Sequence, residues 1–302
     1  MTSFAAALAR GGVVLDGGLG TLLESRGNDL SSTLWSARLL LENPAEIRDA
    51  HAEYFRAGAD VAITASYQVS YEALARRGHA GAAADAVLRS SVRLAIEARD
   101  ATREEAHGRP AWVAASVGPY GAMLADGSEY SGDYGLTVPQ LRQWHRRRIQ
   151  VLAASAADLL AVETIPSLAE AEAVALEIAG TGKPAWISLT SAFGALRSGD
   201  SLVEAYRIAS DPAEVVAVGV NCTDPHDVAT AIAAARQVTD KPVIVYPNSG
   251  EQWDAKNRRW MGSAEFPHEL VREWIAAGAA AVGGCCRVGP TQVAAIAATV
   301  RG

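Results

Sequence analysis

The sequence has few cysteines and no excess of basic residues. Only three cysteines occur among 302 residues, and no two of them form a Cys-x-x-Cys pair. This small, odd number, in a chain without a recognisable secretion signal, indicates a reducing cytoplasm. The formal net charge of −7 argues against a nucleic-acid partner, which would require a basic surface.

The sequence also lacks the segments that direct a chain to a membrane. The stretch from Met1 to Arg10 has no basic residues ahead of its short apolar run, so we expect no signal peptide. No apolar run is long enough to span a bilayer. The phosphate-binding pattern Gly-x-x-x-x-Gly-Lys-Ser/Thr is missing, and the glycines in 17–20 lack the third spaced glycine of a dinucleotide site. We therefore expect neither a membrane nor a dinucleotide among the partners.

Short apolar segments alternate with helical segments along the chain, which is typical of parallel βαβ units. Eight units predict one α/β domain over residues 1–302, a (β/α)8 barrel of the TIM type, whose usual size is about 250 residues plus insertions. An open, doubly wound sheet is the alternative. The expected strands begin at Val13 and then cover 61–64, 112–117, 159–163, 185–190, 215–221, 242–246 and 279–284. The expected helices cover 44–58, 71–107 with a break at 78–81, 138–157, 168–179, 201–209, 227–238, 264–277 and 290–300.

All three cysteines follow strands of this expected barrel. Cys222 follows the sixth strand, and the adjacent Cys285 and Cys286 follow the eighth. The carboxyl ends of barrel strands face one mouth, where such folds keep their chemistry. Three thiolates there predict a soft-metal site with an open fourth position, which distinguishes a catalytic zinc site from a structural one. Two alternatives are small buried hydrophobic residues and a redox-active disulfide between Cys285 and Cys286.

Two carboxylates, Asp16 and Glu163, also end expected strands. They can bind a substrate ammonium group, while the backbone at Gly17 approaches a substrate carboxylate. Helix caps, buried ion pairs or a general acid/base pair are alternative roles. No histidine ends a strand, and we expect the histidines in helices or loops at the surface. They are His51, His79, His107, His145, His226 and His268.

Two polar segments need a separate interpretation. The loop 120–134 combines three acidic residues with three tyrosines, and 246–253 is similar in character. Such a loop is either a solvated surface segment or a lid whose carboxylates and aromatic faces favour a cation. The basic run Arg146–Arg148 lies in a helical pattern, so we expect it on a solvated face.

Several motifs together resemble the homocysteine S-methyltransferases, and within them the branch that uses S-methylmethionine. The Asn-Cys and Gly-Gly-Cys-Cys motifs mark the wider family, and the loops after strands three and seven mark that branch. The resemblance extends from residue 16 to residue 287. The motifs are Asp16–Gly18, Ile63–Gln68, Ser116–Gly121, Ala125–Tyr130, Asp158–Thr164, Gly219–Cys222, Tyr246–Glu251 and Gly283–Arg287.

The resemblance implies a complete site. Zn²⁺ would be held by Cys222, Cys285 and Cys286, and Asp16 and Glu163 would bind the homocysteine amino group. Gly17, Ser66 and Asn221 would complete the substrate site, with Gly17 backbone and the Ser66 hydroxyl at the carboxylate. No side chain would act as acid or base, because the zinc-activated substrate thiolate is itself the nucleophile.

The implied reaction transfers a methyl group from S-methylmethionine, with S-adenosylmethionine as a further donor, to homocysteine and forms methionine. The alternatives are betaine or another donor, selenocysteine as the acceptor, and a zinc- or thiol-binding sensor without turnover. The expected partners are homocysteine and a small sulfonium donor. We expect a cytoplasmic monomer or weak homo-oligomer.

Overall fold

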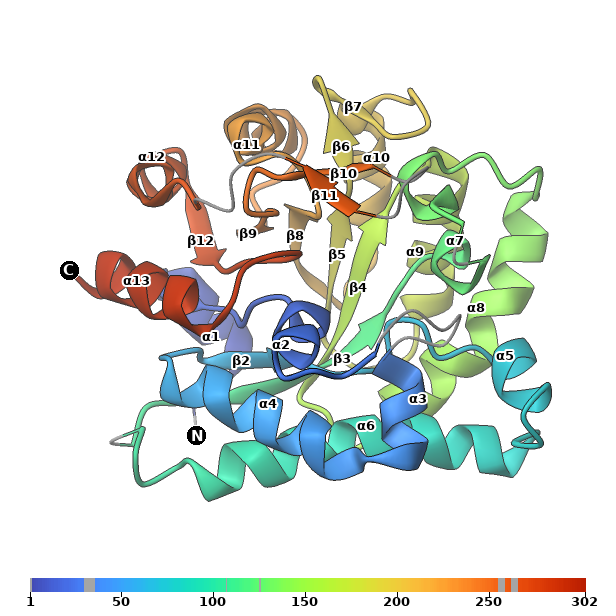
Figure 1. The fold of residues 1–302 in the computed structure, drawn as a ribbon. Helices are drawn as coiled ribbons and strands as arrows, with labels where there is room; N and C mark the ends of the chain where they lie inside the picture. Colours follow the sequence, from blue (N-terminus) through green and yellow to red (C-terminus); the bar gives the residue numbers. More distant parts are fainter. Residues whose placement is uncertain (1, 30–35, 107, 125, 255–258, 262–265) are drawn as a thin grey trace.

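A parallel sheet of eight strands forms the centre of the molecule. The computed structural model describes residues 2–29, 36–106, 108–124, 126–254, 259–261 and 266–302. Within these residues the strands follow the order β1-β12-β9-β8-β5-β4-β3-β2 (Figure 1). Their bounds are β1 Val13–Val14, β2 Val61–Ile63, β3 Trp112–Val117, β4 Leu159–Ile165, β5 Ala185–Leu189, β8 Val215–Asn221, β9 Val243–Tyr246 and β12 Ala279–Val282.

Backbone contacts between β1 and β2 close this sheet into a barrel. Leu15 forms a parallel bridge with Val61. The Asp16 amide donates to the Val61 carbonyl at 3.0 Å, and the Asp60 amide donates to the Val14 carbonyl at 2.7 Å. The expected (β/α)8 barrel is therefore confirmed, and the doubly wound alternative is wrong.

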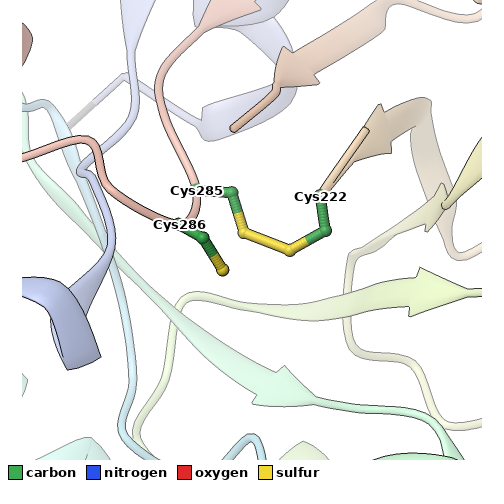
Figure 2. A group of neighbouring side chains, drawn as sticks. All are labelled: Cys222, Cys285 and Cys286. Atoms are coloured by element: carbon green, nitrogen blue, oxygen red, sulfur yellow. A yellow bond between two sulfur atoms is a disulfide. The ribbon is translucent and has the colours of Figure 1, made fainter. Parts of the chain in front are cut away.

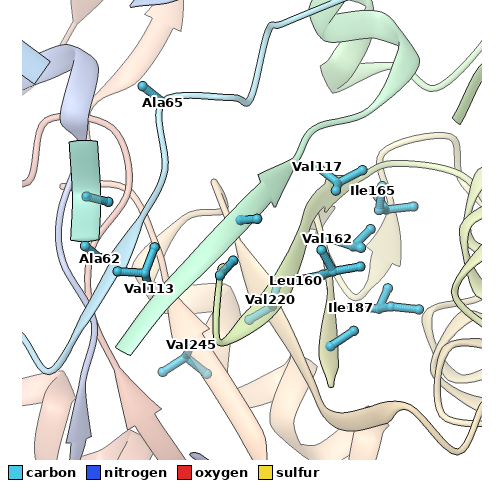
Figure 3. Close-up of a cluster of buried hydrophobic side chains, with 14 of the residues drawn as sticks. Ala62, Ala65, Val113, Val117, Leu160, Val162, Ile165, Ile187, Val220 and Val245 are labelled. Carbon is cyan, nitrogen blue, oxygen red and sulfur yellow. The ribbon is translucent and has the colours of Figure 1, made fainter. Parts of the chain in front are cut away.

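The barrel strands are apolar on both faces, as parallel strands covered by helices require. All residues of β3 and β4 are buried. Along β4, Leu159 and Ala161 belong to the cluster inside the barrel, whereas Leu160 and Val162 belong to the cluster under the helices. Figure 3 shows part of the outer cluster, with Leu160 and Val162 near Ile187.

Helices surround the barrel, and most begin and end close to the expected residues. Prolines stand at the first turns of the helices that begin at 44 and 290, and Ser167 caps a helix by accepting from the Glu170 amide at 3.3 Å. The break expected at 78–81 is confirmed: the region 71–107 contains two helices separated by 76–81, and the second ends at Ala101 rather than at 107. The expected start at 264 lies outside the described residues. The surrounding helices are α4 Pro44–Arg56, α5 Tyr71–Ala75, α6 Ala82–Ala101, α8 Val138–Ala153, α9 Leu168–Ile178, α10 Leu202–Ala209, α11 Val228–Arg236, α12 His268–Ala276 and α13 Pro290–Arg301.

Short elements that the apolar pattern did not predict cover the barrel ends. Helix α1 (Phe4–Arg10) places Phe4 against Trp112 and Trp186, at ring-centroid distances of 5.6 and 5.8 Å. Trp112 begins β3, so α1 closes the end opposite the cysteines. The other short elements are α2 Leu19–Ser25, α3 Ser36–Glu42, α7 Tyr120–Leu124, the 3-10 helices η1 Ser128–Tyr130 and η2 Pro225–Asp227, and the hairpins β6 Ser191–Ala192 with β7 Ala195–Leu196 and β10 Gln252–Asp254 with β11 Arg259–Met261.

Two histidines and one arginine contradict the expected surface positions. His51 and His145 are fully buried, and burial lowers the pKa of His51 to about 4. His145 lies 2.9 Å from a Glu170 carboxylate oxygen. Arg148 is buried and stacks on Trp144, with its guanidinium 4.3 Å from the ring centroid. These residues lie on helix faces that pack inward, which a polar residue type alone does not reveal. His107 lies outside the described residues.

Of the helices that the structure describes, none is long and apolar enough to cross a membrane.

Candidate metal and substrate site

The three cysteines meet at the carboxyl end of the barrel. Cys222 follows β8, and Cys285 and Cys286 lie in the loop after β12; their sulfur atoms all lie within 4.8 Å of one another (Figure 2). Cys222 and Cys285 are joined by a disulfide, and Cys286 is free. The pair that forms is therefore not the adjacent pair that the sequence offered as a redox alternative.

The cysteine cluster fits a tetrahedral soft-metal site once the disulfide is reduced. Three thiolates at about 2.3 Å from Zn²⁺ lie roughly 3.8 Å from one another in tetrahedral geometry. Every pair of sulfur atoms lies within 4.8 Å, and reduction of the disulfide would let Cys222 and Cys285 separate to that spacing. A disulfide offers no thiolate, so Cys222 and Cys285 can act as ligands only in the reduced state. Three soft donors on two fixed strand ends suit zinc.

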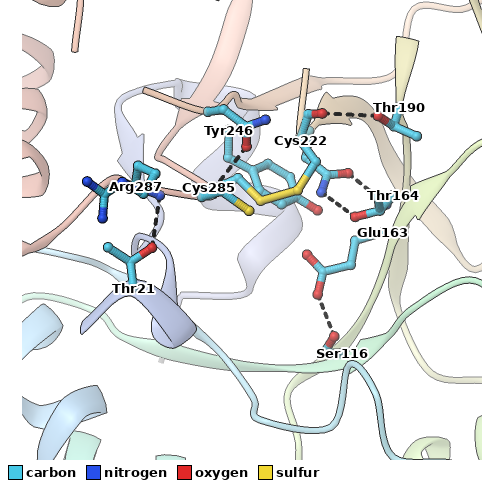
Figure 4. Close-up of a disulfide and its surroundings, with 12 residues drawn as sticks. Thr21, Ser116, Glu163, Thr164, Thr190, Cys222, Tyr246, Cys285 and Arg287 are labelled. Atoms are coloured by element: carbon cyan, nitrogen blue, oxygen red, sulfur yellow. Dashed lines mark hydrogen bonds between the residues drawn. A yellow bond between two sulfur atoms is a disulfide. The ribbon is translucent and has the colours of Figure 1, made fainter. Parts of the chain in front are cut away.

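The end of β9 and the two residues after it hold the backbone of all three cysteines. The Cys222 amide donates to the Tyr246 carbonyl at 3.3 Å, and the Cys285 amide donates to the Pro247 carbonyl at 2.8 Å. The Cys286 amide donates to Asn248 Oδ1 at 3.1 Å. Figure 4 shows Cys222 and Cys285 beside Tyr246. The Tyr-Pro-Asn motif therefore fixes the positions of the cysteines.

Glycines bring the first loop against the cysteine turn. A Cβ at Gly18 would lie 2.5 Å from the Cys285 carbonyl oxygen, and a Cβ at Gly17 would collide with the Val288 carbonyl oxygen. The Gly18 amide donates to the Val288 carbonyl at 2.9 Å, and Tyr54 donates its hydroxyl proton to the Gly18 carbonyl at 2.9 Å. Close backbone approach thus requires both glycines. The Gly17 contact with a substrate carboxylate stays a prediction.

Asp16 is a buried carboxylate with one unused oxygen. Its Oδ2 accepts from the Ile63 amide at 2.8 Å, whereas its Oδ1 has no hydrogen-bond partner among the described residues. Burial raises the pKa of Asp16 well above its usual value; the Ile63 amide opposes that shift, and the charge of Glu163 adds to it. The unused oxygen is suited to a donor brought by a ligand.

Glu163 lies near Asp16 and accepts a hydrogen bond from the Ser116 hydroxyl (Figure 4). The Tyr246 hydroxyl also donates to Glu163. Burial raises the pKa of Glu163 to about 7, although both hydroxyl groups lower it. No basic side chain in the described part of the chain pairs with Glu163 or Asp16. A substrate ammonium would supply the missing positive charge. The expected roles of both residues stay predictions that this geometry supports.

The Ser66 hydroxyl is already engaged. It donates to the Ser116 carbonyl at 2.8 Å and lies 2.8 Å from Thr64 Oγ1. Its only proton is therefore committed inside the protein. Contact between this hydroxyl and a substrate carboxylate stays a prediction and would require that hydrogen bond to be exchanged.

Asn221 connects the two strand ends that carry the chemistry. Its Nδ2 donates to Thr164 Oγ1 at 2.7 Å, and its Oδ1 accepts from the Thr164 amide at 2.8 Å. Cys222 follows Asn221, and Thr164 follows Glu163. Thr164 and Cys222 have left-handed φ angles of 60° and 49°. Asn221 thus positions both ends, and its predicted contact with substrate stays untested. Sequence reasoning missed Thr164 as its partner, because no spacing rule links residues 57 positions apart.

The loop after β3 lies over the sulfur cluster. The Tyr130 hydroxyl and the Cys286 thiol share a hydrogen bond, and burial raises the pKa of this thiol to about 12. Tyr67 hydrogen-bonds Thr164 from the neighbouring loop. Asp126 and Asp133, by contrast, are exposed. One side of the loop therefore faces solvent, and the other side brings aromatic residues to the cysteines.

A family model described as homocysteine S-methyltransferase matches residues 13–300. The chain belongs to the homocysteine S-methyltransferase family. It is 48% identical to homocysteine S-methyltransferase 4 of Zea mays over 97% of this chain and 90% of the relative. It is 44% identical to selenocysteine Se-methyltransferase of Brassica oleracea var. italica over 95% of this chain and 88% of the relative. The expected enzyme class is confirmed.

Solved structures of a related homocysteine methyltransferase support the same assignment. The metallated form of MmuM from Escherichia coli superposes with a TM-score of 0.85 at 40% identity, over 95% of this chain and 96% of that chain. Its oxidised form superposes with a TM-score of 0.85 at 41% identity, over 95% of both chains. A family member with this barrel thus exists in metallated and oxidised forms, and the cysteine cluster is compatible with a metal.

Proposed function

We propose that this enzyme transfers a methyl group from S-methylmethionine to the thiolate of homocysteine in a zinc-dependent reaction that yields methionine. S-adenosylmethionine is a further donor. The observation that carries the proposal is that three sulfur atoms, all within 4.8 Å of one another, lie at the same end of the barrel as the buried carboxylates Asp16 and Glu163. An amino acid with a thiol side chain matches this site, because its ammonium group suits the two carboxylates and its sulfur suits a metal held by the cysteines. We also propose a cytoplasmic monomer or weak homo-oligomer.

The residues of the chain would align the reactants. In the reduced protein, Cys222, Cys285 and Cys286 would hold zinc, and zinc would supply the positive charge that keeps a substrate thiol deprotonated near neutral pH. Asp16 and Glu163 bind the homocysteine ammonium and so orient its sulfur toward the cluster. The three cysteine thiolates make the site electronegative, which favours a cationic donor.

The methyl transfer itself requires no protein acid or base. The donor's sulfur–methyl bond breaks as the new carbon–sulfur bond to homocysteine forms, and the donor sulfonium leaves as a neutral thioether. The protein contributes alignment of the two sulfur atoms with the methyl carbon and exclusion of competing water. With S-methylmethionine, both products are methionine.

The test is methionine formation from homocysteine with S-methylmethionine, S-adenosylmethionine and betaine in turn, on reduced protein of measured zinc content. We expect activity with S-methylmethionine that disappears on chelation and returns with zinc. Cys285→Ser should lose both bound zinc and turnover while circular dichroism shows a folded barrel. Full activity of zinc-free Cys285→Ser would sink the proposal.

Selenocysteine is a second candidate acceptor. A relative that is 44% identical over 95% of this chain is named selenocysteine Se-methyltransferase. Selenocysteine and homocysteine both present an α-ammonium group and a soft nucleophile, but selenocysteine is one methylene shorter. Comparing kcat/KM for the two acceptors with one donor decides between them.

A further inference from the structure

Two opposite charges flank Tyr130 and are not among the residues proposed to hold homocysteine. Glu129 precedes Tyr130 in η1, and the Arg197 guanidinium carbon lies 5.6 Å from the Tyr130 ring centroid. Tyr130 in turn hydrogen-bonds Cys286. Both charges therefore lie beside the place where the donor's methyl group must arrive.

The loops that carry these charges meet at the end of β4. The Ser198 amide donates to the Pro166 carbonyl at 3.1 Å. A Cβ built on Gly132 would lie 3.1 Å from the same carbonyl oxygen. The Arg197 amide donates to the Thr190 carbonyl at 3.3 Å, and the Thr190 hydroxyl donates to the Cys222 carbonyl at 3.2 Å. These contacts hold Arg197 and the Tyr130 loop over one side of the cysteine cluster.

Each charged group has an unused buried atom. Glu129 Oε2 and Arg197 Nε are buried and have no hydrogen-bond partner among the described residues. Over the same residues, neither side chain forms a salt bridge. Buried polar atoms normally have partners, and a ligand with complementary charges would supply them.

We infer that Arg197 and Glu129 recognise the methyl donor as an α-amino acid, with Arg197 binding its carboxylate and Glu129 binding its ammonium group. The inference rests on the proposed function and deepens it. A guanidinium presents a planar fork that matches a carboxylate, and a carboxylate accepts charge-assisted hydrogen bonds from an ammonium. The donor's sulfonium would then lie next to the aromatic face of Tyr130.

This arrangement separates donor classes. An amino-acid sulfonium such as S-methylmethionine satisfies both charges. A betaine has a carboxylate but its only cationic centre is the methylated nitrogen, so Glu129 would remain without an ammonium donor. Specificity then follows from the penalty of leaving a buried charge unpaired.

The experiment measures kcat/KM for each side-chain variant with an intact donor and with donors that lack one charged group. Three donors are compared. The first is S-methylmethionine. The second, (3-carboxypropyl)dimethylsulfonium, lacks its α-amino group, and the third, (3-aminopropyl)dimethylsulfonium, lacks its carboxylate. Glu129→Gln should lower kcat/KM for S-methylmethionine about tenfold or more, as loss of a charge-assisted hydrogen bond predicts, and leave the analogue without the amino group nearly unaffected. Arg197→Gln should likewise lower kcat/KM for S-methylmethionine and leave kcat/KM for the analogue without the carboxylate nearly unaffected.

Matched controls keep the test specific. Asp133→Asn, on the exposed side of the same loop, and Arg207→Gln, at an exposed position of α10, should leave donor kinetics unchanged. The homocysteine KM should stay within about twofold in every variant, and Arg197→Lys should recover part of the activity because it retains the charge. If Glu129→Gln misfolds by circular dichroism, Glu129→Asp takes its place.

Two outcomes are distinguishable. If the wild type methylates homocysteine but each variant loses the same factor in kcat/KM with all three donors, the two charges do not bind the donor's amino-acid groups and the inference is wrong. If zinc-loaded wild type turns over with no donor, the proposed function fails and the inference fails with it.

Discussion

At the scale of single residues, Glu163 is a buried carboxyl group without a basic partner among the described residues. Burial raises the pKa of its carboxyl from 4.5 to about 7. A raised carboxyl pKa means that the ionised form is disfavoured by folding. The corresponding contribution to stability is present below pH 4.5 and is lost as pH rises through about 7, with an upper magnitude of about 3 kcal/mol.

We predict that metal-free, substrate-free wild type loses stability relative to Glu163→Gln between pH 4.5 and pH 7. Chemical denaturation across this range measures the difference in unfolding free energy. Homocysteine should reverse the trend in the zinc-loaded wild type, because its ammonium stabilises ionised Glu163, so its KM should rise as pH falls below about 7. Parallel stability curves for the two proteins would contradict this account.

At the scale of elements, the link between β4 and β8 carries both halves of the site. Asn221 makes two buried hydrogen bonds to Thr164, and these residues adjoin Cys222 and Glu163. We predict that Asn221→Ala lowers the unfolding free energy by about 2–4 kcal/mol, as loss of two buried hydrogen bonds implies. It should also weaken zinc affinity and raise the homocysteine KM together.

The measurements for Asn221→Ala are thermal unfolding, zinc titration and homocysteine kinetics. Asn221→Asp serves as the conservative variant, because it retains the oxygen that accepts from the Thr164 amide. A stability loss with unchanged zinc affinity and unchanged KM would show that this link supports the fold but does not position the site.

Sequence periodicity predicted the strands well, because parallel strands buried on both faces read as apolar runs. β3 covers the expected residues 112–117, and β8 the expected 215–221. The cysteine cluster could also be predicted from the sequence, since barrel topology places strand ends together. The contact between Arg197 and Tyr130 could not be predicted, because it depends on the paths of two loops. Nor was the burial of His145, because its partner Glu170 lies on another helix.

At the scale of the whole molecule, the cysteine cluster ties together parts of the chain that are distant in sequence. Cys222 and Cys285 are separated by 63 residues, and β9 lies between their strands in the sheet. Anything that joins the sulfur atoms therefore fixes β8 and β12 relative to each other across β9. The disulfide does so in the oxidised state, and a metal held by the same thiolates would do so in the reduced state.

We predict that zinc stabilises the reduced barrel as a unit. Ligand binding to the native state alone stabilises by about 4 kcal/mol at a free ligand concentration 1,000 times Kd, which should raise Tm by several degrees for a chain of this size. Differential scanning calorimetry of reduced wild type with and without zinc measures the effect, and Cys285→Ser should show little of it. Oxidised wild type should show no zinc-dependent rise, because two of its three sulfur atoms are bonded to each other. An equal rise in oxidised and reduced protein would place zinc elsewhere, whereas a rise confined to the reduced wild type would show that the metal and the disulfide compete for the same sulfur atoms.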